Sequence, residues 1–119
     1  MATFALAMLV CADLERSKRF YGTILGLKAG TGAAPHWARF DLGEGRTLGL
    51  LPASESLTVR PGSLQLGFHV DDVDKFVTDA RTAGVPILQE PHDESFGRIA
   101  VIADPDGYPV QVATPKAAR

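Results

Sequence analysis

The chain has 119 residues, a formal net charge of −2 and a pI near 5.8, and its basic residues are dispersed rather than clustered. It therefore lacks the clustered basic residues that bind nucleic acid or an anionic membrane, and we expect neither partner. A chain of this length can bury roughly two-thirds of its unfolded surface, so folding needs no metal or disulfide. The single cysteine, Cys11, lies in an apolar run and is expected to be buried.

The sequence begins with an apolar run over residues 4–12 that has no basic leading segment and continues directly into a helix signal. We therefore expect a strand here rather than a signal peptide. No apolar run reaches the roughly 20 residues that are needed to span a bilayer. These observations predict a cytoplasmic protein.

The first half of the chain predicts one strand, one helix and further strands. Residues 5–12 form the first strand, and Asp13 is the expected N-cap of a helix over residues 14–25 that ends at Gly26. A loop with Gly and Pro follows, and strands are expected at 37–42 and 47–51. The connection over residues 52–62 is rich in Ser and Pro.

The same order then repeats. A strand is expected at 64–70, a helix from Asp72 to Gly84, a short strand at 85–88, and a hairpin with strands at 99–103 and 110–113 around Asp104-Pro105-Asp106-Gly107. Aligning Asp13 with Asp72 superimposes the two halves. We predict a single domain, residues 1–119, made of two modules at 1–57 and 62–119 that are joined by a linker at 58–61.

Alternation along the strands separates two faces of each predicted sheet. Apolar residues mark the face that packs under the helices. The other, inner face carries Trp37 and Arg39 in one strand, and Gln111 in the last strand. The first strand is apolar on both faces, so only the repeat decides that its inner residues include Leu6 and Met8.

Three segments give the chain a family resemblance that covers nearly its whole length. They are Asp13-Leu14-Glu15-Arg16-Ser17 with Phe20-Tyr21 and Leu25-Gly26-Leu27, then Val70-Asp71-Asp72-Val73-Asp74, and Asp104-Pro105-Asp106-Gly107-Tyr108. On these motifs the chain resembles the vicinal oxygen chelate superfamily, also called the glyoxalase, bleomycin resistance protein and dioxygenase group. The resemblance implies an α+β fold of two βαβββ modules that form a cupped, partly closed mixed sheet with helices on the outer side. It also implies a homodimer with a small-molecule site in the cup.

Enzymes of this family bind a divalent metal through four strand positions, and the resemblance places these on Leu6, Gly49, Gln65 and Gln111. Leucine and glycine offer no side-chain donor atom, and two neutral amides lack the charge or basicity that tight metal binding requires. We therefore expect no metal and no other cofactor. No two of the three histidines have the spacing of metal ligands, and His36 and His92 are expected at the surface.

The inner faces predict a small-molecule cavity with an apolar wall and a few polar groups. Trp37 and Arg39 would stack on a planar ligand and hold an anionic or carbonyl group. Trp37 could instead form a core or dimer contact, Arg39 a surface ion pair with Asp41 or Glu44, and the two glutamine amides could satisfy each other. The predicted lining is Leu6, Met8, Trp37, Arg39, Gly49, Gln65, Gly67, His69, Ile99, Val101 and Gln111.

The resulting prediction is a metal-independent protein that binds a small organic molecule and sequesters an antibiotic or a toxic metabolite. One alternative is a glyoxalase-like lyase or isomerase, or an extradiol-type dioxygenase, with a divalent metal. Within the enzyme class, His69 is the candidate acid or base, and the favoured alternative is a hydrogen-bonded histidine at the cavity rim. A third alternative is an accessory or sensor domain whose cavity is filled by its own side chains.

Overall fold

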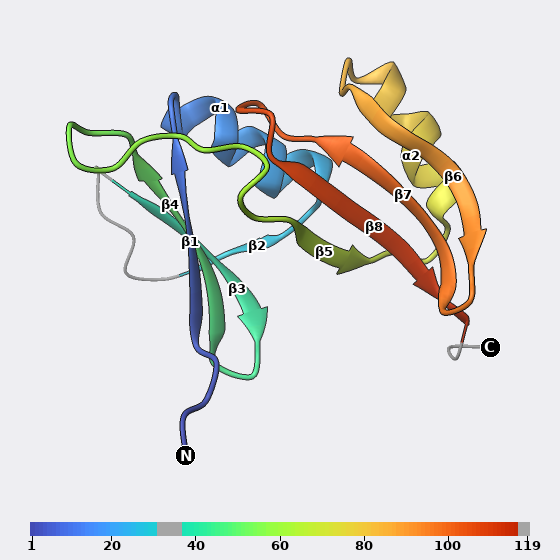
Figure 1. Cartoon of the computed structure of the whole chain (residues 1–119), viewed down its shortest axis with the longest axis horizontal. Coiled ribbons are helices and arrows are strands. Elements are labelled where there is room, and N and C mark those ends of the chain that lie inside the picture. Colours follow the sequence, from blue (N-terminus) through green and yellow to red (C-terminus); the bar gives the residue numbers. More distant parts are fainter. Residues whose placement is uncertain (31–36, 117–119) are drawn as a thin grey trace. The chain divides into compact units, whose positions relative to one another are not determined.

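The computed structural model describes residues 1–30 and 37–116, and His36 lies outside this part of the chain. The chain divides into a first unit, Met1–Arg60, and a second unit, Pro61–Arg119. Each unit consists of a four-stranded mixed sheet and a helical segment (Figure 1). This confirms the predicted α+β class with two βαβββ-like modules. The linker at 58–61 and the assignment of both modules to a single domain remain predictions.

The first unit has the strand order β1-β4-β3-β2, in which β1 runs parallel to β4 and the other pairs are antiparallel. The first strand of the unit therefore lies at the edge of the sheet, beside the last strand. The elements, in chain order, are β1 (Leu6–Cys11), α1 (Leu14–Arg19), the π-helical turn η1 (Phe20–Ile24), β2 (Lys28–Ala29), β3 (Ala38–Gly43) and β4 (Arg46–Pro52).

The helix of the first unit has the predicted extent but changes its winding. Asp13 caps α1, since its side chain accepts the backbone N–H of Arg16 at 3.1 Å. The N–H of Leu25 donates to the carbonyl of Phe20 at 3.1 Å, five residues back, so the last turn is a π-helix. Gly26 then ends the helix with φ 73°, which confirms the predicted stop. The widened turn buries two consecutive aromatic rings, Phe20 and Tyr21.

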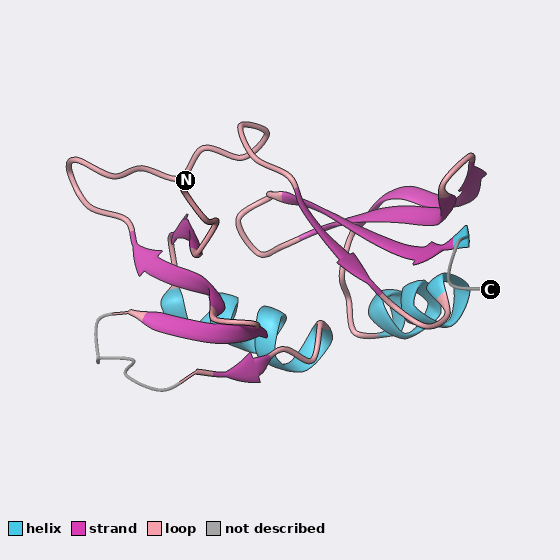
Figure 2. Ribbon diagram, turned by 90° about the horizontal axis from the view of Figure 1, so that it is seen from below, coloured by secondary structure: helices cyan, strands magenta, loops and turns pink. Residues whose placement is uncertain are grey.

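The second unit repeats this plan with the strand order β5-β8-β7-β6 and a parallel pair of β5 and β8. Asp72 caps α2 by accepting the N–H of Lys75 at 3.1 Å. In each unit the helix covers one face of the sheet (Figure 2). The elements are β5 (Leu66–His69), α2 (Val73–Thr82), β6 (Ile87–Glu94), β7 (Gly97–Ala103) and β8 (Pro109–Pro115).

Strand β6 is longer than the sequence predicts. The apolar pattern indicates a strand only over 85–88, whereas β6 continues to Glu94 along a polar segment. Its register against β7 shifts between Ile87 and Gln89 and again between Gln89 and His92. Such bulges break the alternation of side chains, and Pro91, which lies within the second shift, has no N–H for the ladder. The sequence pattern therefore ends before the strand does.

The predicted hairpin between β7 and β8 is present, and Asp104 organises its turn. This carboxylate is 5% exposed, and its Oδ1 accepts the backbone N–H groups of Asp106 and Tyr108, both at 2.9 Å. Gly107 has φ 90°, and its N–H donates to the carbonyl of Asp104 at 3.0 Å. The turn therefore needs both the buried aspartate and a glycine that tolerates positive φ.

Each unit has its own apolar layer between the helix and the sheet. Cys11 is 1% exposed, which confirms the prediction that it is buried. No helix in the described ranges 1–30 and 37–116 is long and apolar enough to cross a bilayer. The buried strand residues of this layer are Leu9, Cys11, Ala38, Phe40, Leu48 and Leu50 in the first unit, and Ala100, Ile102, Val110 and Val112 in the second.

Candidate functional site

The register of the first sheet brings predicted site residues to one face, opposite the helix. Parallel pairing sets Met8 of β1 beside Gly49 of β4, and antiparallel pairing sets Arg39 of β3 beside Gly49 from the other side. Leu6 is likewise beside Thr47. Because paired residues point to the same side of a sheet, these side chains share a face.

A hollow of about 350 Å³ opens on this face, and we call it the apolar pocket. Leu6 and Met8 supply much of its apolar wall and are 49% and 39% exposed. The full lining is Leu6, Met8, Trp37, Arg39, Thr47 and Leu51. Four of these six residues were predicted to line the cavity. Thr47 and Leu51 were missed, although they have the same strand parity as Gly49 and alternation could have identified them.

Gly49 itself is buried beneath the side chain of Met8. A β-carbon added at position 49 would collide with the Met8 sulfur and would lie 3.1 Å from its terminal methyl carbon. The space that a larger residue would occupy at position 49 is thus filled by a flexible thioether from the neighbouring strand.

The guanidinium of Arg39 lies over the indole ring of Trp37, and its central carbon is 5.9 Å from the ring centroid, within the range of a cation–π contact. The side chain is half-buried and forms no ion pair in the described part of the chain. Its two predicted partners are engaged elsewhere. Asp41 accepts the N–H of Gly43 at 2.9 Å, and Glu44 pairs with Arg46 at 2.6 Å.

A second hollow of about 360 Å³, the polar hollow, lies on the same sheet. It shares Arg39 and Thr47 with the apolar pocket. The sequence prediction did not include Lys28, which lines this hollow from the short strand β2. Strand β2 has only two residues, so no alternation could have assigned its face. The remaining lining residues are Ala29, Gly30, Asp41, Gly43, Glu44 and Gly45.

The other predicted cavity residues belong to the second unit. Gly67 is the register neighbour of Gln111, which also pairs with Val101 on its other side. The amide nitrogen of Gln111 lies 3.9 Å from where a β-carbon of Gly67 would be. His69 is exposed at the end of β5. Ile99 is 7% exposed on β7, and Gln65 is exposed just before β5.

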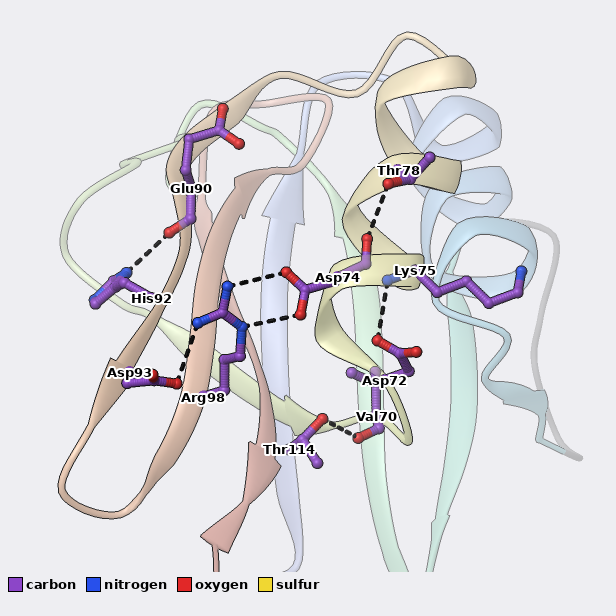
Figure 3. A network of polar contacts seen from close by, with 10 residues as sticks. All are labelled: Val70, Asp72, Asp74, Lys75, Thr78, Glu90, His92, Asp93, Arg98 and Thr114. Carbon is purple, nitrogen blue, oxygen red and sulfur yellow. Dashed lines mark hydrogen bonds and ion pairs between the residues drawn. The ribbon is translucent and has the colours of Figure 1, made fainter.

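A polar cluster in the second unit joins β7 to the first turn of α2 (Figure 3). Arg98 donates to both carboxylate oxygens of Asp74, at 2.9 and 3.1 Å, and to Asp93 at 3.1 Å. The hydrogen bond from Arg98 holds the pKa of Asp74 below its usual range. A hollow of about 430 Å³ adjoins these residues. Because its central charges pair with one another, we interpret this cluster as a structural clamp rather than a ligand site.

Comparison with known proteins agrees with this architecture. The model of the Glyoxalase/Bleomycin resistance protein/Dioxygenase superfamily matches residues 3–112. The chain belongs to this superfamily. The two βαβββ-like modules and the family match together confirm the resemblance drawn from the sequence motifs.

Solved structures of other proteins align along almost the whole chain. An antibiotic-binding protein from Streptomyces sp. CB03234 is 26% identical, with 98% of each chain covered and a TM-score of 0.79. A glyoxalase-related enzyme from Fulvimarina pelagi is 26% identical, with 96% of this chain and 88% of that chain covered and a TM-score of 0.79. A protein from Agrobacterium tumefaciens is 28% identical, with 97% of this chain and 98% of that chain covered and a TM-score of 0.80.

The divalent metal of superfamily enzymes does not fit the residues of this chain. At two of the four positions that the sequence resemblance assigns to metal ligands, Leu6 and Gly49 offer no donor atom, and the Met8 side chain covers Gly49. Gln65 and Gln111 offer only neutral amide oxygens, which are weak ligands without a carboxylate or imidazole beside them. Across residues 1–30 and 37–116, no group of three or more His, Cys, Asp or Glu side chains is placed to hold a metal ion.

Proposed function

We propose that this superfamily member is a metal-independent binding protein that sequesters a small organic molecule such as an antibiotic or a toxic metabolite. The observation that carries the proposal is the apolar pocket, in which Trp37 and Arg39, which has no ion pair among the described residues, lie beside an apolar wall. Small-molecule sites typically combine apolar walls with a few polar groups in this way.

Two further observations support binding. Ligand pockets usually have volumes of about 300–1,000 Å³, and the apolar pocket, at about 350 Å³, lies within this range. This volume argues against the alternative of a sensor domain with a filled cavity. In addition, the similar protein from Streptomyces sp. CB03234 binds an antibiotic.

We also propose a ligand-binding face on the second unit, formed by the predicted cavity residues Gln65, Gly67, His69, Ile99, Val101 and Gln111. We also propose that the protein is a cytoplasmic homodimer, which is the assembly that the family resemblance implies. Analytical ultracentrifugation measures this assembly directly, and a monomer at micromolar concentration would contradict it.

The similarity to a glyoxalase-related enzyme keeps an enzymatic role as the second candidate. A lyase, isomerase or dioxygenase of the family type requires a metal, for which the donor set is unsuited. A metal-independent reaction would rely on His69 and Arg39. In that case His69→Ala abolishes turnover and leaves binding largely intact, whereas loss of both together indicates a binding contact.

Ligand binding can be tested through Trp37, because it is the only tryptophan in the chain. We expect planar aromatic ligands, including aromatic antibiotics, to quench its fluorescence saturably at micromolar concentration and to raise the melting temperature. Peptide antibiotics form the second arm of the screen. Absence of quenching and of thermal stabilisation across both arms would contradict the proposal.

A further inference from the structure

The apolar pocket and the polar hollow adjoin on one sheet face, and Arg39 and Thr47 line both. On one side of these two residues lie the side chains of Leu6, Met8 and Trp37. On the other side lie charged groups from β2 and β3 and from the turn that follows β3. A ligand that occupies both hollows must therefore have an apolar part and a charged part.

The charges around Arg39 indicate the sign of that charged part. Glu44 is engaged by Arg46 at 2.6 Å, and Asp41 is the register neighbour of Lys28. Asp41 can balance the charge of Lys28, which leaves Arg39 as the cation for a bound group. Its guanidinium already lies over the ring of Trp37, a contact that lowers the side-chain freedom left to lose when an anion binds.

We infer that the ligands of this pocket are aromatic acids. The ring system lies against Leu6 and Met8, and the carboxylate or sulfonate accepts charge-assisted hydrogen bonds from Arg39 at the junction of the two hollows. The planar guanidinium fork suits such bidentate acceptors better than a lone carbonyl group. This inference rests on the proposed function and narrows it to a chemical class.

Two fluorescent probes with the same ring skeleton test the inference directly. Anilinonaphthalene sulfonate carries an acidic group, and N-phenylnaphthylamine lacks it. Binding near the pocket is detected as probe emission excited by energy transfer from Trp37. We expect the full-length protein to bind the sulfonate at least about 10-fold more tightly, a difference of about 1.4 kcal/mol.

Arg39→Gln should remove this preference by weakening the sulfonate about 10-fold and the neutral probe less than about 2-fold. The matched control is Arg19→Gln, which removes the same charge from the exposed surface of the helical segment of the same unit. It should leave both affinities unchanged. Circular dichroism establishes whether each variant is folded. If Arg39→Gln does not fold, the comparison of the two probes on the unmodified protein still decides the question.

The outcomes separate this inference from the proposed function. Equal affinities of the two probes, or equal losses in Arg39→Gln and Arg19→Gln, would overturn the acid preference and leave small-molecule binding intact. If neither probe receives energy from Trp37, and the antibiotic screen is also negative, the proposed function fails and the inference fails with it.

Discussion

The thioether of Met8 lies where the side chain of residue 49 would begin, and the two residues are register neighbours on β1 and β4. At the position that the sequence resemblance assigns to a metal ligand, this chain thus has a glycine covered by a methionine. Methionine adapts readily to irregular spaces because it is unbranched and has three rotatable bonds. Met8 therefore fills the space above Gly49 and forms part of the apolar wall of the pocket.

Gly49→Ala should change the pocket more than it changes stability. The new methyl group displaces the flexible end of Met8 into the pocket, while alanine gains about 0.5–1 kcal/mol over glycine within a strand. We expect the free energy of unfolding to change by less than about 1 kcal/mol and the affinity for anilinonaphthalene sulfonate to fall. Urea titration and probe titration measure the two effects.

The double variant Met8→Ala/Gly49→Ala is the control for this explanation. Removing the long side chain of Met8 gives the new methyl group space. We therefore expect the double variant to bind the probe more tightly than the sum of the two single-variant effects predicts. A loss of affinity that is simply additive would contradict displacement of Met8 as the cause.

Divalent metals should not stabilise the protein. Because the four family ligand positions offer two amides and no carboxylate or imidazole, we expect Zn²⁺, Ni²⁺, Mn²⁺ and Fe²⁺ to leave the melting temperature unchanged. A specific site would add about 2.7 kcal/mol at a metal concentration of 100 times Kd. Thermal unfolding of chelator-treated protein with and without each metal makes the measurement, and metal content near one per chain would disprove the ligand assignment.

The clamp between Arg98 and Asp74 predicts a pH dependence of stability. The pKa of Asp74 is lowered in the folded state, so the ion pair stabilises the fold above the usual aspartate pKa and this contribution is lost as the pH falls through the lowered value. We expect the unfolding midpoint of the unmodified protein to exceed that of Asp74→Asn at neutral pH and the difference to shrink below about pH 4.

Arg98→Gln provides the second arm of this experiment, because it removes the cation that lowers the pKa of Asp74. The stability difference between this variant and the unmodified protein should also narrow in acid. Urea midpoints measured from neutral pH to strongly acidic pH give both curves. A stability difference that stays constant over the whole pH range would show that the ion pair between Arg98 and Asp74 does not stabilise the fold.

Asp104→Ala should destabilise the hairpin of β7 and β8. The variant leaves the N–H groups of Asp106 and Tyr108 without their acceptor in a buried turn. We expect a cost of about 2 kcal/mol in the free energy of unfolding, as for other hydrogen bonds to charged groups. Asp104→Asn retains an oxygen acceptor and should cost less, and equal losses in urea denaturation would contradict a role for these hydrogen bonds.

The features that the sequence predicted well are decided by local chemistry. Asp13 and Asp72 cap helices because their side chains accept backbone N–H groups within the same turn. Gly26 and Gly107 adopt positive φ where a helix ends and a hairpin turns. Neither effect depends on distant parts of the chain, so the spacing of these residues in the sequence was sufficient.

The features that the sequence missed depend on pairing between segments. The extension of β6 to Glu94 comes from its partner β7, and the two bulges hide it from any alternation pattern. The ion pairs that the sequence left open for Arg39 do not form among the described residues, where Asp41 accepts the N–H of Gly43 and Glu44 pairs with Arg46. The position of Met8 over Gly49 is a matter of side-chain conformation, which no sequence pattern specifies.

The parallel pair of β1 and β4 has a consequence for synthesis of the chain on the ribosome. Its first contact, between Leu6 and Thr47, closes a loop of roughly 40 residues, and the pair of Leu66 with Val110 repeats this in the second unit. The opening strand of each unit must therefore wait, unpaired and partly apolar, until the closing strand has left the exit tunnel. Synthesis proceeds at about 5–20 residues per second, so this interval lasts seconds, and it is the period in which nascent chains are most exposed to chaperones and to one another.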